Sequence, residues 1–290
     1  MSLSSAQLDA FYEVSRCKSF SKAATLLHVT QSALSQRIAH LEQELGATLF
    51  IRAPSGLCLT LLGEELQHYC KSRSMLEDEC VSRIKNAQSG TMVGVIRIGA
   101  YSTVLRSIVL PSLSPFLIAH EDVRLEASSK ETRDLPQALR SGEVDFIFLD
   151  HRLESEKVET VFLGDEEYVL IESKHVNRDN SVYFDHDVQD QTTLRFFEAQ
   201  SQRPKVVSRS FLDEIYAIID GVALGLGRAV VPLHLVKNDK RIRRVKELKP
   251  LRIPVYFIYN RQSVYTRLQK AVIALLEREP KAFLSPNMVL

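Results

Sequence analysis

Residues 30–46, TQSALSQRIAHLEQELG, carry the helical pattern that most limits how this chain can fold. Leu34, Ile38, Leu41 and Leu45 recur at helical spacing and share one narrow apolar stripe. The opposite side begins with short polar side chains instead of the lysines and glutamates that usually cover a solvent-facing helix. Such a helix must bury its stripe against other helices, and its polar side can approach another surface closely.

The residues before this helix predict two further helices. One extends from about Ser5 to Arg16, and a short one covers residues 22–29, KAATLLHV, with Ser21 as its N-cap. The helix that follows the turn is expected to end at Gly46. A short helix, a tight turn and a second helix with a polar outer face form a helix-turn-helix arrangement.

The next segment predicts a hairpin and then a long helix. Residues 47–63 place two short apolar pieces around a Pro-Ser-Gly turn, which indicates a small β-hairpin, or wing. Thr60 is expected to cap a helix that runs to about Gln88, roughly 42 Å long. A helix of this length with one apolar stripe needs a partner helix. Arg73 interrupts that stripe, and residues 89–94 after it indicate a hinge. The stripe consists of Leu62, Leu66, Tyr69, Leu76, Cys80, Ile84 and Ala87.

From Val93 onward the pattern alternates between strands and helices. Strands at 94–100, 123–129 and 144–150 with helices between them predict a parallel βαβαβ unit. A second α/β unit follows. Its expected elements are strands at 158–164, 166–173, 205–210, 228–232 and 254–260, and helices near 192–200, 212–225 and 264–279.

Charge is distributed unevenly along the chain, although the net charge is only +1. Between Val14 and Leu41 there is no Asp or Glu, and between Leu45 and Gly63 the only charged residue is Arg52. An acid-free, positive region suits a phosphate-bearing partner. The same pattern also fits a weakly charged, partly buried helical region.

Composition and motifs exclude several classes of protein. The 290 residues suggest two or three compact units, and 45% hydrophobic residues with 25% charged residues is typical of a soluble protein. The first residues lack a signal-peptide pattern and no apolar run has membrane-spanning length, so we expect a cytoplasmic protein with no membrane partner. No metal site is expected because the cysteines form no CxxC pair, and these cysteines are expected to be reduced and structural: Cys17, Cys58, Cys70 and Cys80. No enzyme is expected because HExxH, GxSxG and P-loop motifs are missing.

Residues 19–66 resemble the LysR-type transcriptional regulators. The similarity covers Ser-Phe before an Ala-Ala helix, Gln-x-Ala-Leu-Ser in the following helix, Leu-Phe-x-Arg in the wing, and Leu-Thr-x-x-Gly at the start of the long helix. GVALGLGRAVVP (221–232) and the order of elements extend it over the rest of the chain. The sequence departs from the family pattern in two places. Ser32 stands where the family often has Pro, and the turn of the wing lacks the basic residue that is common there.

The resemblance implies an N-terminal all-α winged helix-turn-helix with a long linker helix. It further implies a C-terminal α/β effector domain of two Rossmann-like subdomains, similar to periplasmic binding proteins. The expected boundaries are 1–60 for DNA binding and 61–89 for the linker and dimerisation helix. The effector domain would span 92–290, with subdomain I at 92–161 and 265–290 and subdomain II at 162–264.

The resemblance also implies which residues face DNA. Gln can bridge the N6 and N7 atoms of adenine, and an Ala methyl can contact thymine in the major groove. The groove-facing candidates are Gln31, Ser32, Ala33, Ser35 and Gln36, and the phosphate candidates are Ser21, Lys22, Arg37 and Arg52. Arg37 could instead be structural, and Arg52 could brace the wing.

A ligand of the second half is expected outside the carboxyl ends of the parallel strands. Ser102 and Thr103 would begin a helix there and offer hydroxyls and free N–H groups to an anion, although Ser102 could be merely an N-cap. Arg228 is a candidate carboxylate clamp, with a surface salt bridge as the alternative. The effector candidates are Tyr101, Ser102, Thr103, Ser128, Ser129, Asp150, Ser210, Phe211 and Arg228.

The sequence therefore predicts a DNA-binding transcriptional regulator that responds to a small, anionic effector and needs no cofactor. Its expected partners are double-stranded DNA, a second copy of itself in a homodimer or homotetramer, the effector and RNA polymerase. Two other classes stay open: a solute-binding or transport-associated protein, because the second half resembles a two-lobed binder, and an enzyme with an appended DNA-binding domain.

Overall fold

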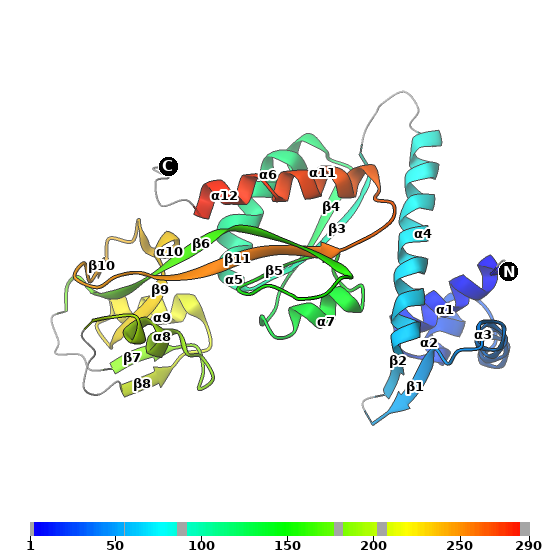
Figure 1. Ribbon diagram of the computed structural model, residues 1–290, viewed down its shortest axis with the longest axis horizontal. Helices are drawn as coiled ribbons and strands as arrows, with labels where there is room; N and C mark the ends of the chain where they lie inside the picture. Colours follow the sequence, from blue (N-terminus) through cyan, green and yellow to red (C-terminus); the bar gives the residue numbers. More distant parts are fainter. Residues whose placement is uncertain (1–2, 55, 86–91, 177–181, 202–207, 285–290) are drawn as a thin grey trace.

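The computed structural model describes residues 3–54, 56–85, 92–176, 182–201 and 208–284. Figure 1 shows a small N-terminal domain, a long upright helix α4 (Leu61–Lys85), and an elongated α/β domain of two lobes. Helix α4 lies between the small domain and the nearer lobe (Figure 1). This arrangement confirms the predicted fold class, a winged helix-turn-helix joined by a linker helix to a two-lobed domain.

The small domain packs three helices around one apolar core. These are α1 (Ser5–Cys17), α2 (Phe20–Leu26) and α3 (Gln31–Leu45). Three residues of the predicted α3 stripe are buried: Leu34, Ile38 and Leu41 are at most 3% exposed and pack with the core residues of α1. The fourth, Leu45, is 37% exposed at the end of the helix. Burial of this stripe fixes which side of α3 faces outward.

Caps account for the ends of these helices. The Thr30 side chain accepts a hydrogen bond from the Ala33 backbone N–H at 3.2 Å, and α3 ends at Gly46 in the left-handed conformation with φ 62°. Helix α2 begins earlier than predicted. Its N-cap is Ser19, which accepts from the Lys22 N–H, so Ser21 lies inside the helix and the prediction of a Ser21 cap is wrong.

The predicted wing is present as two antiparallel strands, β1 (Phe50–Ala53) and β2 (Gly56–Leu59). The Thr60 hydroxyl then accepts from the Gly63 N–H at 3.0 Å, which confirms the predicted cap of α4. Three predictions lie outside the described residues: the continuation of this helix to Gln88, the stripe residue Ala87, and residues 89–91 of the hinge.

Gly63 is where α4 passes closest to the chain that enters the wing. A Cβ atom at this position would lie 2.3 Å from the Leu49 carbonyl oxygen and 2.9 Å from Leu59 Cδ2. We expect Gly63→Ala to lower the free energy of unfolding by about 1–3 kcal/mol, because the backbone around Leu49 must move. Ordinary Gly→Ala replacement inside a helix raises stability by about 1 kcal/mol instead. Denaturant unfolding decides the sign, with Ser72→Ala in the same helix as the control, and a stabilised Gly63→Ala protein would contradict the close contact.

One nine-stranded sheet runs through both lobes in the order β4-β3-β5-β11-β6-β9-β7-β8, with β10 paired to β6. Lobe I contains β3 (Gly94–Ala100), β4 (Val123–Ser129), β5 (Phe146–Leu149), α5 (Ser102–Val104), the π-helical segment η1 (Leu105–Val109), α6 (Leu110–Ala119), α7 (Leu135–Arg140), α11 (Arg267–Leu276) and α12 (Glu279–Leu284). Lobe II contains β7 (Val182–Asp185), β8 (Ser208–Phe211), β9 (Arg228–Pro232), β10 (Ile242–Arg244), α8 (Thr192–Glu198), α9 (Ile215–Ala223) and α10 (Leu233–Val236). Strand β3 pairs in parallel with β4 and β5, which confirms the predicted parallel βαβαβ unit.

Two long antiparallel strands, β6 (Val158–Ser173) and β11 (Leu251–Asn260), connect the lobes. The sequence predicts separate strands at 158–164 and 166–173, but β6 is continuous because β11 pairs with both halves and Asp165 lies opposite Pro254. A register shift between Val255 and Tyr256 leaves Leu163 of β6 without a paired residue on β11. The expected subdomain boundary at 161/162 therefore falls inside a strand. The expected strand at 205–210 begins among residues outside the described part, and the single helix expected near 264–279 is divided into α11 and α12.

The helical run Ser102–Ala119 is long and apolar enough to cross a membrane by length and composition, with a mean hydropathy of 1.4. In the structure this run covers the sheet of lobe I. Val104, Ile108, Val109 and Leu113 are at most 1% exposed and belong to the main apolar core. Its apolar side thus has a partner inside the protein.

Candidate functional sites

Helix α3 presents an exposed polar surface in its first two turns. Gln31, Ser32, Ala33 and Gln36 are exposed, and Ser35 is half-buried. These side chains contact mainly one another: the Gln31 amide donates to Ser35 Oγ at 3.3 Å. The Ser32 hydroxyl lies 3.1 Å from that of Thr30. Side chains held only by short local contacts can exchange those contacts for base edges.

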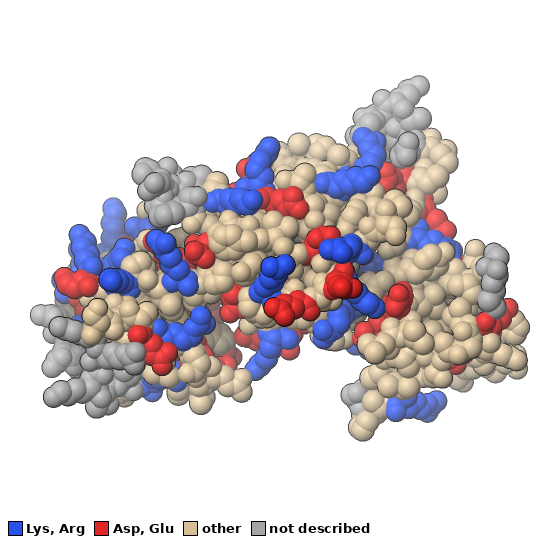
Figure 2. Space-filling model, viewed as in Figure 1, with Lys and Arg blue, Asp and Glu red and all other residues tan. Residues whose placement is uncertain are grey.

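The basic candidates come from α2, α3 and the wing. Among the described residues, neither Lys22, Arg37 nor Arg52 forms an ion pair, and Lys22 and Arg52 are exposed. Arg52 extends from β1 of the wing, opposite Leu57. Figure 2 shows the small domain, at the right, as largely uncharged on the face in view, whereas the lobes carry mixed positive and negative charge.

Helix α4 carries an exposed apolar seam that no part of the described chain covers. Leu62, Tyr69 and Leu76 recur every seven residues and are 56%, 54% and 37% exposed. Cys80 is also exposed and Ile84 is 73% exposed. Leu66 differs from the other predicted seam residues because it packs against the core of the small domain. The interruption at Arg73 has a cause, since its guanidinium binds Asp9 of α1 at 2.9 Å.

The inner side of α4 attaches to lobe I through a buried ion pair. Lys71 Nζ lies 2.5 Å from Asp145 Oδ1 and donates to the Gly142 carbonyl at 2.7 Å. The two side chains are 11% and 6% exposed. Farther along α4, Glu79 accepts from the Arg267 N–H at the start of α11 at 3.1 Å. Sequence reasoning missed this attachment, because a charge pair separated by more than 70 residues leaves no local pattern.

A cleft of about 740 Å³ opens between the two lobes, at the carboxyl ends of the parallel strands. Five of the predicted effector residues line it: Tyr101, Ser102, Thr103, Ser129 and Asp150. Their role in binding stays a prediction. Sequence reasoning missed most of the lobe II wall, which comes from the loops after β7 and β8.

Four predicted effector residues do not line the cleft. Arg228 opens β9, whose parallel pairing with β7 puts its first residue at the end of the strand away from the cleft. There its guanidinium binds Glu172 at 2.7 Å, so the alternative reading as a salt bridge holds and the carboxylate clamp is wrong. Ser128 points to the face of β4 opposite Ser129. The lining after β8 begins only at Asp213, beyond Ser210 and Phe211.

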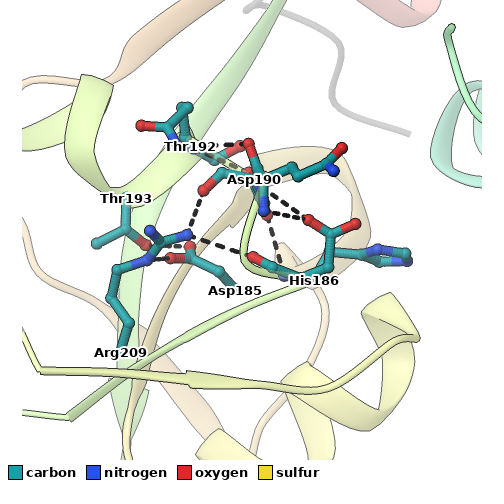
Figure 3. A network of polar contacts seen from close by, with 9 residues as sticks. Asp185, His186, Asp190, Thr192, Thr193 and Arg209 are labelled. Atoms are coloured by element: carbon teal, nitrogen blue, oxygen red, sulfur yellow. Dashed lines mark hydrogen bonds and ion pairs between the residues drawn. The ribbon is translucent and has the colours of Figure 1, made fainter.

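The lobe II wall is organised by Asp185, at the end of β7 (Figure 3). Its carboxylate accepts hydrogen bonds from the Thr193 hydroxyl and the Arg209 guanidinium. Arg209 also donates to the carbonyls of Asp187 and Asp190, which ties the loop to β8. Burial raises the pKa of Asp185, and the hydrogen bonds from Thr193 and Arg209 oppose that rise. Hydrogen bonds from Arg209 of β8 therefore hold the loop that follows β7.

A buried carboxylate behind the cleft residue Tyr101 joins the lobes. Glu166 on β6 is 1% exposed and accepts from the Tyr101 hydroxyl at 2.9 Å. Its other oxygen lies 2.7 Å from His234 Nε2 in lobe II. Burial, and next the charge of Glu166, raise the pKa of Tyr101 well above its ordinary value, so the phenol stays a proton donor. Burial likewise raises the pKa of Tyr168, which also lines the cleft.

Within the described ranges, no group of three or more His, Cys, Asp or Glu side chains is placed to hold a metal ion. None of the four cysteines, all of which lie in the described part of the chain, forms a disulfide. Burial raises the pKa of the Cys70 thiol to about 12, and its sulfur lies 3.8 Å from the Leu8 carbonyl oxygen in the domain core. A thiol that stays protonated at neutral pH is a poor nucleophile, so Cys70 acts as a core residue.

Comparison with known proteins matches both halves of the chain. The model of the bacterial regulatory helix-turn-helix protein, lysR family, matches residues 5–64, and the LysR substrate binding domain matches residues 89–281. The chain is 27% identical to the HTH-type transcriptional regulator YofA of Bacillus subtilis (strain 168), over 91% of this chain and 95% of YofA. ArgP from Mycobacterium tuberculosis has a similar fold, with a TM-score of 0.78 at 21% identity over 98% of both chains. Full-length LysG from Corynebacterium glutamicum with bound effector Arg gives a TM-score of 0.73 at 18% identity, over 96% of this chain and 98% of LysG.

Proposed function

This chain belongs to the LysR family of DNA-binding transcriptional regulators with an effector-binding domain, and we propose that α3 reads its operator in the major groove while a small molecule in the interlobe cleft controls the outcome. The single observation that carries the proposal is the outer side of α3. It combines exposed hydrogen-bonding side chains with neighbouring Lys and Arg groups that have no acidic partner in the described chain. Specific DNA recognition needs both features, because phosphate contacts position the protein and base contacts specify the sequence.

The proposal assigns two kinds of contact. Gln31, Ser32, Ala33, Ser35 and Gln36 read base edges, and Ser21, Lys22, Arg37 and Arg52 bind phosphates. The exposed seam of α4 pairs with its copy in a second chain, which brings two α3 helices to two half-sites. The assembly, a homodimer or a dimer of such dimers, acts on cytoplasmic DNA together with RNA polymerase. It is proposed to work as a binding protein with no catalytic step and no membrane partner.

The effector is proposed to carry an acidic group. The start of α5 supports this, because Tyr101 occupies the N-cap position without a side-chain cap and the next two residues, Ser102 and Thr103, line the cleft. The bound effector Arg of LysG supports a small-molecule effector for this fold. Closure of the lobes around such a ligand would be transmitted to α4 through the Lys71–Asp145 pair.

Substitutions in α3 and the wing separate base reading from phosphate binding. We expect Gln31→Ala and Gln36→Ala each to weaken binding to the operator by about 1–3 kcal/mol and to relax its sequence preference. Arg52→Ala should weaken operator and random DNA by a similar factor, and it should reduce the salt dependence of binding. Fluorescence anisotropy with DNA from upstream of the gene and with a scrambled duplex measures both effects.

The control variant is Gln43→Ala, at an exposed position near the opposite end of α3. It should bind both duplexes like the unmodified protein. An unchanged ratio of operator to random affinity in both Gln31→Ala and Gln36→Ala would show that this face does not read bases. Binding of a small molecule with no DNA binding at all would favour the solute-binding alternative.

A further inference from the structure

The two walls of the interlobe cleft differ in electrostatic character. From lobe I the lining has two basic and two acidic residues, Lys130, Arg133, Glu131 and Asp150. From lobe II it has one arginine, Arg195, and the carboxylates Asp185, Asp187, Asp190, Asp213 and Glu214. The charges of the lobe I wall therefore balance, whereas the lobe II wall is acidic and repels a purely anionic ligand.

The lobe I wall has a prepared place for an anionic group. The helical run Ser102–Ala119 begins at the cleft, and no side chain caps its first N–H groups. Thr103, in its first turn, is 7% exposed and lines the cleft, but its hydroxyl has no hydrogen-bond partner among the described residues. A buried hydroxyl without a partner costs free energy unless a ligand satisfies it. A carboxylate at this helix start would accept from the hydroxyl and from the free N–H groups together.

The lobe II wall offers no comparable place for an anion. The N-termini of its two helices at the cleft are already occupied by the chain's own carboxylates. Asp190 accepts from the Thr192 N–H at 2.8 Å at the start of α8, and Glu214 accepts from the Ala217 N–H at 2.8 Å at the start of α9. Asp185 is neutralised by Arg209 (Figure 3). Beside these lies Asp187, which accepts backbone hydrogen bonds through Oδ1 only.

We propose that the effector is a small zwitterion, an amino-acid-like molecule whose carboxylate binds the start of α5 at Thr103 and whose ammonium group faces Asp187 on the opposite wall. The proposal rests on the proposed function of the cleft and narrows the class of its ligand. A zwitterion would favour closure of the two lobes, because lobe I attracts its carboxylate and lobe II attracts its ammonium group. A molecule with one charged group would engage one lobe only.

A panel of matched molecules tests the proposal. The proteinogenic α-amino acids, β-alanine and 4-aminobutyrate are titrated calorimetrically into the full-length protein, each beside the acid that lacks its amino group and the amine that lacks its carboxylate. We expect at least one zwitterion to bind, with both of its single-charge analogues at least about tenfold weaker. Equal binding of the deaminated acid or of the amine, or binding of no zwitterion in the panel, would overturn the proposal.

Two substitutions then assign the poles. Thr103→Val keeps the shape and burial of the side chain, and it should weaken the zwitterion and its deaminated acid by the same factor, about tenfold. Asp187→Asn keeps an oxygen for the backbone hydrogen bonds, and it should weaken the zwitterion but leave the deaminated acid unaffected. Glu121→Gln, an exposed change outside the cleft, is the control for both. The reverse pattern, or no effect of either change, would overturn the assignment.

Failure of this inference is separable from failure of the proposed function. Operator binding that responds to α3 substitutions, combined with a cleft that rejects every zwitterion, would remove only the ligand class. Zwitterion binding without any DNA binding would remove the regulatory function and leave the ligand class intact.

Discussion

Lys71→Met is expected to lower the free energy of unfolding by about 3–5 kcal/mol, because it leaves Asp145 buried without its counter-ion. Both side chains are almost fully enclosed between α4 and lobe I, and the Lys71 ammonium also satisfies the Gly142 carbonyl. Water cannot solvate the unpaired Asp145 carboxylate well, so the loss of stability is larger than for an exposed ion pair. Denaturant unfolding at neutral pH measures the loss.

The double variant Lys71→Met with Asp145→Asn is the matched control. Asparagine removes the buried charge but keeps an oxygen that can accept from the Arg97 N–H, which Asp145 does at 3.2 Å. We expect the double variant to recover most of the lost stability, since neutral groups replace the pair. A single variant as stable as the unmodified protein, or a double variant no better than the single one, would contradict a buried pair at this contact.

The same pair has a consequence for signalling. It joins the helix that carries the DNA-binding domain to the lobe that carries the start of α5, so it lies on the physical route between the two proposed sites. In the double variant, DNA binding should persist while the response of that binding to the effector weakens.

Leu76→Lys should convert the protein to a monomer and weaken its binding to a two-fold symmetric operator by about 10²–10⁴-fold. The first effect follows because the seam of Leu62, Tyr69 and Leu76 would have to bury a charge against its copy. The second follows because a monomer loses the high effective concentration of the second DNA-binding unit. Sedimentation velocity and anisotropy on the same sample measure the two effects.

Asp78→Lys controls for the added lysine. Asp78 is exposed on the side of α4 away from the seam, so this variant should stay oligomeric. Circular dichroism checks that Leu76→Lys is folded. A melting temperature as low as that of a chain without the small domain would indicate that the small domain of Leu76→Lys is misfolded. A Leu76→Lys protein that sediments like the unmodified one would show that another surface forms the oligomer.

The parts of the fold that were predicted correctly depend on local periodicity. Leu34, Ile38 and Leu41 share a stripe in the sequence and are buried together, and the strands 94–100 and 123–129 are the observed β3 and β4. Thr60 and Gly46 mark helix ends by side-chain chemistry that acts within a few residues. Such signals are present in a single short window of sequence.

The features that were missed depend on contacts between distant residues. Lys71 and Asp145 are a pair only because α4 packs on lobe I, and Asp185 meets Arg209 only because β7 and β8 are neighbours in the sheet. The sequence predicts Arg228 as a carboxylate clamp in the cleft, but the direction of β9 puts it at the other end of the strand. Alternation within β4 likewise removes Ser128 from the cleft, although its neighbour Ser129 lines it.

Selection of binding sequences from a randomised pool of DNA duplexes tests the central claim most directly, because it requires no knowledge of the operator. If α3 reads bases and the α4 seam pairs two chains, the selected duplexes will share a sequence with two-fold symmetry. They should bind at least about 10³-fold more tightly than the starting pool at physiological salt. Recovery of duplexes with no common sequence, bound no more tightly than the starting pool, would contradict the assignment of α3 as the recognition helix.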